Sequence, residues 1–141
     1  MGYPSPEEER RLLTHLRRVH PIETLRPVTD TDTLAAMQPQ VWDVHVDETL
    51  QDYIVALAGA TREHPDLALG ASPRASLALF RASQALAALR GRGHVLPEDV
   101  QTLAPDVLTH RLLLKPEAAL RGRTPQGVMR DILSETPLPI T

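Results

Sequence analysis

The chain has 141 residues, of which 42% are hydrophobic and 23% charged, and its formal net charge at pH 7 is -3. This balance argues against a disordered tail, a collagen-like chain and a polybasic nucleic-acid binder. Cysteine is absent, which excludes disulfides and thiolate metal sites, and the sequence shows neither a signal-peptide pattern nor an apolar run long enough to span a bilayer. We therefore expect a cytoplasmic protein with no membrane or nucleic-acid partner.

Ala and Leu are abundant while aromatic residues make up only 3% of the chain, a composition that suits close helix packing better than a sheet core. The expected fold is mainly α, a small bundle of about five to six helices with at most a very short extended pair. We expect a single domain over residues 1–141, with an entry helix and loop over 1–28, a helical bundle over 29–136 and a proline-containing tail over 137–141.

The first helix is predicted to begin at Ser5, which can cap it. Pro6 suits the first helical position, and Glu8 stands three residues after the cap, as a capping box requires. The helix is expected to end at His20, because a proline disfavours the α conformation in the residue before it.

A short helix is predicted next, before a connector. Thr31 or Asp32 can cap this helix, and Pro39 limits its length. Residues 41–46 alternate weakly and predict an extended connector or a very short strand. Trp42, the only tryptophan, lies in this connector, where we expect a core plug or an interdomain contact.

Two long helices follow. Asp47 is placed to cap the first, which carries apolar residues at helical spacing and is expected to end at His64, before a proline. Residues 66–71 predict a short apolar turn, and Ser72-Pro73 predicts a second sharp helix start. The helix beginning there is the longest and is expected to end at Gly91.

The last third of the chain predicts two further helices. One begins at Pro97, and Pro105 falls inside its apolar pattern, so we expect a kink or a break near Ala104. Residues 110–115 are expected to be extended, and Thr124 starts the final helix.

Arg74 is the candidate with the clearest chemistry, because it places a cation in the first turn of the longest helix. The N-terminal end of a helix favours anions, so an arginine there is electrostatically unfavourable unless something offsets it. A phosphate does so, since arginine binds it bidentately while the helix end attracts it from the same direction. On the residues alone, an arginine near a helix start is more often solvated or paired with an acidic neighbour. Ser72 and Pro73 would position Arg74 by starting the helix.

Other candidates carry weaker chemistry. Arg81 lies two turns beyond Arg74 on nearly the same face, so it is a secondary candidate for the same anion, beside the alternative of a solvated or salt-bridged surface arginine. The histidines show no paired spacing such as HxxxH, and we expect no metal site. Four arginines near the helix ends could form a basic surface, but no aromatic residues lie between them, which argues against nucleic-acid binding.

Eight short blocks resemble, in order, those of one family, the MoxR branch of the AAA+ ATPases, and together they cover nearly the whole chain. The blocks are Gly2-Tyr3-Pro4-Ser5, His20-Pro21-Ile22, Tyr53-Ile54-Val55, Ala60-Thr61-Arg62, Leu69-Gly70-Ala71-Ser72-Pro73-Arg74, Gly91-Arg92, Pro97-Glu98-Asp99-Val100 and Val107-Leu108-Thr109-His110-Arg111. In that family the Ser-Pro-Arg block is the sensor 2 element. The resemblance therefore implies that the chain is the C-terminal lid domain and that Arg74 reaches the γ-phosphate of ATP.

The resemblance also implies what lies outside the chain. A P-loop needs a glycine-rich run followed by Lys and Ser or Thr, and the 141 residues contain none. We expect the Walker motifs, ATP and Mg²⁺ to belong to an ATPase core before Met1, so this chain alone holds no catalytic residue and should not hydrolyse ATP. The resemblance further implies a hexameric chaperone that matures partner complexes, often with proteins bearing von Willebrand factor A domains. The alternative is a free-standing helical interaction module in which Arg74 has no nucleotide role.

Overall fold

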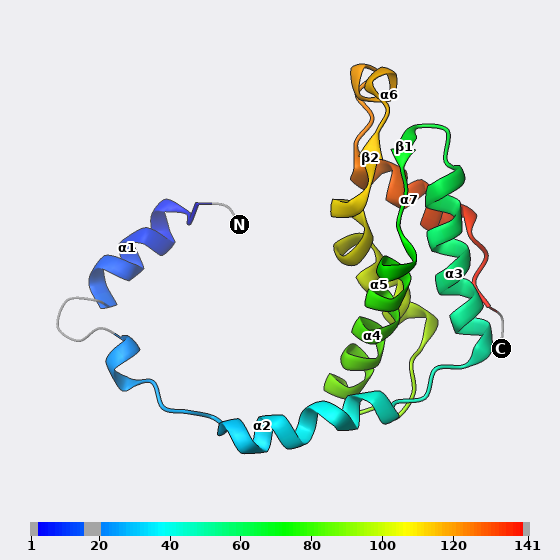
Figure 1. Cartoon of the computed structure of the whole chain (residues 1–141). Helices are drawn as coiled ribbons and strands as arrows, with labels where there is room; N and C mark the ends of the chain where they lie inside the picture. Colours follow the sequence, from blue (N-terminus) through cyan, green and yellow to red (C-terminus); the bar gives the residue numbers. More distant parts are fainter. Residues whose placement is uncertain (1–2, 16–20, 140–141) are drawn as a thin grey trace. The chain divides into compact units, whose positions relative to one another are not determined.

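The structure, a computed structural model, describes residues 3–15 and 21–139. The chain forms two compact units, residues 1–35 and 36–141 (Figure 1). Helices predominate in both, and within the described residues the sheet consists of two short strands. The predicted mainly α fold with a very short extended pair is confirmed. No helix in this described part of the chain has the length and apolarity to cross a membrane.

The first unit begins with α1 (Pro6–His15). The backbone N–H of Ser5 donates to the Glu8 carboxylate at 2.7 Å, and the N–H of Glu8 donates to Ser5 Oγ at 3.4 Å. The predicted capping box is therefore confirmed. The predicted helix end at His20 lies outside the described residues, and a 3-10 helix, η1, follows at Pro21–Thr24.

The cap of α2 (Thr31–Met37) differs from the prediction. Asp30 provides it, because its carboxylate accepts the N–H of Thr33 at 2.7 Å. Thr31 and Asp32 are already helical, so neither stands in the residue before the helix where a cap belongs. The prediction was wrong by one residue for Thr31 and by two for Asp32, since a side chain directly before the first turn reaches the free N–H groups better than one inside it.

The connector after α2 is only partly extended. A 3-10 helix, η2 (Gln38–Asp43), occupies its first part, so the expectation of an extended stretch over 41–46 was wrong there. The second part is extended: His45 N donates to Gly93 O at 2.9 Å, and a parallel bridge joins His45 to His94. Trp42 is 66% exposed, so it does not plug the core of this unit.

Four helices build the core of the second unit: α3 (Glu48–Glu63), α4 (Pro73–Leu89), α5 (Pro97–Leu108) and α7 (Pro125–Glu135). Helix α4 packs against α3 and α5, and α7 packs against α3 and α5. The side chains that lose all contact with water lie between them: Leu57, Leu79, Val100, Leu108, Val128 and Met129. Burying each large apolar side chain stabilises the fold by about 1.5–3 kcal/mol, so these contacts hold the bundle together.

The helix starts in this unit follow the sequence closely. Asp47 caps α3 by accepting the N–H of Thr49 at 2.9 Å, as predicted. Thr124 begins α7 in the same way, since its hydroxyl accepts the N–H of Gly127 at 3.1 Å. Both helices therefore begin where a short polar side chain can satisfy a free backbone donor.

Helix α5 runs through Pro105 without a break, so of the predicted kink or break near Ala104 the break is excluded. The proline removes one backbone donor, but Val100, Ala104 and Leu108 are all fully buried on either side of it. Packing of these residues against the neighbouring helices keeps both halves in one helix. Helical bonding continues beyond it, because Thr109 N donates to Pro105 O.

The strands β1 (Leu67–Leu69) and β2 (Leu113–Leu114) pair antiparallel with one irregularity in their register. They lie in the two segments where the apolar turn and the extended stretch were predicted, although Thr109–Arg111 forms a 3-10 helix, η3, before β2. The sequence analysis missed a short helix, α6 (Pro116–Leu120), which directly follows β2 and lies beyond the two strands in Figure 1.

Candidate functional site

The start of α4 is built by Ser72 and Pro73. Ser72 stands at the cap position in an extended conformation, and its hydroxyl makes no capping bond. Its carbonyl accepts the N–H of Ala75 at 2.8 Å, and Pro73 begins the helix with its fixed φ and no N–H to satisfy. The backbone therefore sets this helix start, and the Ser72 hydroxyl is free.

Arg74 is exposed in the first turn of α4, and Ala71 and Ala75 on either side of it are buried. No acidic residue lies in that first turn, whereas α3 and α5 both carry acids there. The N-terminal end of α4 and the guanidinium thus present positive potential together, the combination that attracts an anion.

The guanidinium of Arg74 is also unengaged. Over residues 36–139, Arg74 and Arg130 are the arginines whose side chains contact no carboxylate, carbonyl oxygen or aromatic ring. The alternative of an acidic partner for Arg74 is not found in this part of the chain. Its five N–H donors therefore remain available to a ligand.

The loop before α4 is seated on the last turn of α3. The N–H of Ala71 donates to Thr61 Oγ1 at 2.8 Å, and Arg62 Nε donates to the carbonyl of the same Ala71 at 2.7 Å. Thr61 is fully buried and donates its hydroxyl hydrogen to Ala58 O at 2.7 Å. A Cβ on Gly70 would lie 2.6 Å from backbone atoms of Thr61 and Arg62, so the two segments touch closely.

Sequence reasoning missed this contact. Arg62 lies in the last turn of α3, where its positive charge also suits the negative end of the helix. The signal that could have pointed to it is Gly70 next to a helix start, since a glycine there often marks a close approach of two backbones.

Arg81 is placed elsewhere. Its guanidinium lies over the ring of Trp42, 5.4 Å from the ring centre, and so packs against η2. Seven helical residues separate it from Arg74, or roughly 10 Å along the axis. The structure therefore gives Arg81 an aromatic partner, and it does not bring Arg81 and Arg74 to one point.

At the other end of α4, a buried ion-pair cluster joins this helix to α5. Asp99, which is fully buried, accepts hydrogen bonds from Arg90 at 2.8 Å and from Arg92 at 2.7 Å, and it caps α5 by accepting the N–H of Leu96 at 2.9 Å. Burial raises the pKa of Asp99, but the hydrogen bond from Arg92, the Leu96 N–H and the two positive charges outweigh it and leave that pKa below its usual value.

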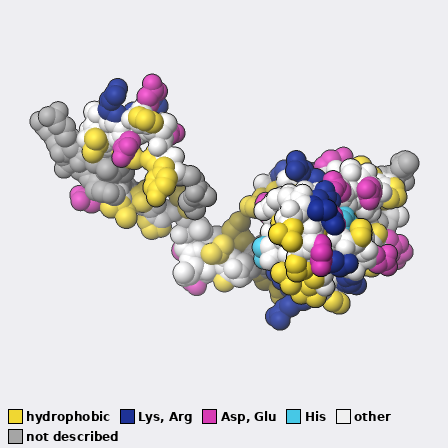
Figure 2. All heavy atoms as spheres, turned by 90° about the horizontal axis from the view of Figure 1, so that it is seen from above, with side chains coloured by type: hydrophobic (Ala, Val, Ile, Leu, Met, Phe, Trp, Pro, Cys, Tyr) yellow, Lys and Arg dark blue, Asp and Glu magenta, His cyan; other side chains and the backbone are white. Residues whose placement is uncertain are grey.

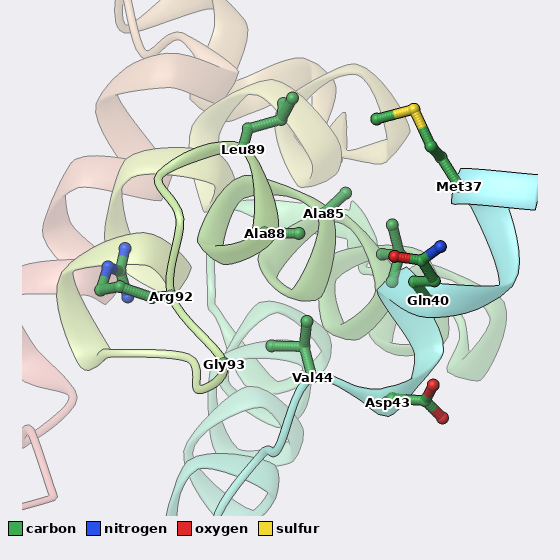
Figure 3. Close-up of a pocket in the computed structure, with 10 residues that line it drawn as sticks. Met37, Gln40, Asp43, Val44, Ala85, Ala88, Leu89, Arg92 and Gly93 are labelled. Atoms are coloured by element: carbon green, nitrogen blue, oxygen red, sulfur yellow. The ribbon is translucent and has the colours of Figure 1, made fainter. Parts of the chain in front are cut away.

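An apolar groove lies beside this cluster (Figure 3). Its volume is about 540 Å³, and Met37 and Gln40 on one wall face Ala85, Ala88 and Leu89 of α4 on the other. Arg92 also lines the groove, but its guanidinium is held by Asp99. The charged residues of the groove are therefore Asp43 and an arginine that is already paired.

Two further arginines of the second unit are paired with acidic side chains. Arg121 and Arg123 both pair with Asp66 at 2.8 Å, and Arg123 also reaches Asp131. Partial burial raises the pKa of Asp66, but these two arginines outweigh it and hold the pKa below its usual range. Figure 2 shows basic and acidic side chains interspersed over the visible face of the second unit. This visible face differs from the basic patch that a nucleic-acid site presents.

Comparison with known proteins gives matches over this same region. A family model described as AAA lid domain matches residues 59–132, which include Thr61, Arg62 and the whole of α4. Two curated relatives align over 99% of the chain: the uncharacterized protein YeaC of Bacillus subtilis, 43% identical, and Chaperone MoxR1 of Mycobacterium tuberculosis, 37% identical. The chain spans 44% and 39% of their lengths.

A solved structure matches as well. The crystal structure of a protein from Cytophaga hutchinsonii, described as an ATPase, is 26% identical to the chain with a TM-score of 0.90. The match covers 99% of this chain and 45% of that one.

Proposed function

Since the chain belongs to the AAA lid domain family, in the MoxR-like branch of the AAA+ ATPases, we propose that it is a nucleotide-responsive lid in which Arg74 contacts the γ-phosphate of ATP. The observation that carries the proposal is the exposed, unpaired guanidinium of Arg74 at a helix start that holds no acid. A phosphate oxygen fits such a site, because charge-assisted hydrogen bonds and the helix end act on it together.

The nucleotide itself would be held elsewhere. The sequence contains no glycine-rich phosphate loop, and the residues that the structure describes hold no cluster of three or more acids or histidines that could bind a metal ion. A separate ATPase core supplies the phosphate and Mg²⁺ sites in this proposal. ATP and Mg²⁺ then bind between that core and the lid, and the lid shifts as the γ-phosphate is gained and lost. Arg74 stabilises the bound triphosphate and does not perform the bond cleavage alone.

The wider role is part of the same proposal. One relative is named as a chaperone, and we extend a chaperone or complex-maturation role to the protein that carries this lid. Its first partner is the ATPase core, and a homohexamer and proteins with von Willebrand factor A domains are the further partners that the proposal includes.

The test replaces Arg74 in the ATPase that carries this lid and measures steady-state ATP turnover. Losing a hydrogen bond to a charged group costs about 1.5–3 kcal/mol, so Arg74→Ala should lower kcat/KM roughly 10-fold or more. Arg130→Ala is the matched control, because Arg130 is likewise exposed and unpaired but lies on α7. Equal turnover in the two variants would refute the role of Arg74.

A second measurement uses the chain alone. One arginine and one helix end supply only part of a phosphate site, so calorimetry should detect no ATP binding below about millimolar concentration. Micromolar binding by the isolated chain would contradict the proposed division between lid and core.

A further inference from the structure

The position of Arg74 depends on one residue of the preceding loop. Ala71 lies three residues before Arg74, and consecutive residues of α3 hold both its N–H and its carbonyl, Thr61 at 2.8 Å and Arg62 at 2.7 Å. Gly70 lets the loop approach the α3 backbone closely enough for both bonds to form. Because Thr61 accepts the Ala71 N–H and Arg62 donates to the Ala71 carbonyl, the two bonds together fix the position of this loop residue on α3 and the orientation of its backbone.

Burial makes this contact rigid. Thr61 is fully buried and Ala71 is 1% exposed, so water cannot take the place of the Thr61 hydroxyl without opening the core. Only Ser72 and Pro73 separate Ala71 from Arg74, and Pro73 has a fixed φ. An error in the placement of Ala71 is therefore passed directly to the first turn of α4.

We infer that Thr61 and Arg62 are positioning residues for Arg74, holding its guanidinium at the distance and angle at which it meets a phosphate in the neighbouring ATPase core. This inference rests on the proposed function. Geometry at this level matters because a displacement of about 1 Å at a charge-assisted contact removes much of its strength. Arg62 is suited to the task, since a planar guanidinium holds its donors in a fixed direction.

The experiment is a double-mutant cycle in the ATPase that carries this lid. Arg62→Met removes the bond to Ala71, and coupled residues commonly show effects of severalfold, so kcat/KM should fall roughly 3- to 10-fold. In the Arg74→Ala background the same change should alter kcat/KM by less than about 1.5-fold, because there is then no guanidinium to misplace. A merely structural role for Arg62 would reduce turnover by the same factor in both backgrounds.

The matched control is Arg111→Met. Arg111 also donates its Nε to a backbone carbonyl, that of Val107 at 3.0 Å, but this bond is exposed and lies within one helical turn at the end of α5. Arg111→Met therefore controls for the loss of an arginine-to-carbonyl bond away from Arg74, and it should leave ATP turnover unchanged.

Thr61→Val is a second test of the same contact that changes no charge, since it removes the acceptor for the Ala71 N–H. In the chain itself, the amide hydrogen of Ala71 should exchange faster with solvent in both Thr61→Val and Arg62→Met.

The outcomes separate the inference from the function on which it rests. If Arg74→Ala leaves kcat/KM unchanged, the proposed function is refuted, and the inference is refuted with it, before any Arg62 variant is examined. If Arg74→Ala lowers kcat/KM but Arg62→Met does not, the inference alone is overturned. The same holds if Arg62→Met lowers kcat/KM by the same factor in both backgrounds. Loss of turnover in Arg62→Met that disappears in the Arg74→Ala background supports it.

Discussion

Substituting Gly70 by alanine tests the close contact between the loop and α3. The added Cβ would lie 2.6 Å from the carbonyl carbon and oxygen of Thr61 and from the nitrogen of Arg62. These are backbone atoms, so no side chain can move aside. The positive-φ glycines of the described chain are Gly91 and Gly122, which means that the strain at Gly70 is steric and not conformational.

The expected cost follows from two contributions. Overpacking in a filled region costs about 1–3 kcal/mol, and weakening the two hydrogen bonds of Ala71 adds about 1 kcal/mol. Gly70→Ala should therefore lower the free energy of unfolding by about 2–4 kcal/mol, or the melting temperature by roughly 10–25 °C for a domain of this size. Urea denaturation of the chain, followed by far-ultraviolet circular dichroism, measures the change.

Gly59→Ala is the matched control within α3. A Cβ there would meet nothing within 4 Å, and alanine is favoured over glycine inside a helix by about 0.5–1 kcal/mol, so this variant should be more stable than the parent. A Gly70→Ala variant that stays within about 0.5 kcal/mol of the parent would refute the described seating of the loop on α3.

Three further variants probe contacts elsewhere in the second unit. Thr124→Ala removes the cap of α7 and should cost about 1 kcal/mol in urea denaturation; an unchanged midpoint would mean that the hydroxyl contributes nothing. Because the pKa of Asp99 is lowered by folding, its contribution to stability is present above about pH 4 and is lost as the pH falls through the lowered value. Asp99→Asn should therefore lower the free energy of unfolding by about 3 kcal/mol at neutral pH, which is towards the low end for a broken buried pair because Arg90 is half exposed. The variant should also show a weaker loss of stability as the pH falls. A loss as steep as that of the parent would contradict this. Arg81→Ala removes the cation over Trp42, so acrylamide should quench the fluorescence of this single tryptophan more efficiently, and unaltered quenching would show that the stacking is absent in solution.

The sequence predicted the helices best where their ends carry local chemistry. Ser5 with Glu8, Asp47 and Thr124 all cap as expected, because each bond joins residues two or three apart. The break that was one of the two outcomes expected at Pro105 is absent because packing outweighs a local penalty, and that packing comes from helices distant in sequence. Helix α6 was missed because it has only five residues, too few to show a periodic pattern.

In the candidate site, too, local features were predictable from the sequence and contacts between distant segments were not. Pro73 revealed where α4 begins and hence that Arg74 lies in its first turn. The bonds from Thr61 and Arg62 to Ala71 span nine to ten residues across a turn, a separation that neither helical spacing nor capping rules describe. The partner of Arg81 was hidden for the same reason, since Trp42 comes from a connector nearly forty residues earlier in the sequence.

Helix α4 is bound to neighbouring segments near its start, in its middle and at its end. Its preceding loop is bound to α3, the side chain of Gln84 donates to Val44 O at 2.8 Å, and Arg90 at its end is bound to Asp99 of α5. A rod of 17 residues fixed at three such points cannot turn about its own axis independently of its neighbours. A push or pull received at Arg74 is therefore passed to α3, to Val44 and to α5 together, so a fluorescent label at the exposed Leu89, at the other end of α4, would register an event at its start.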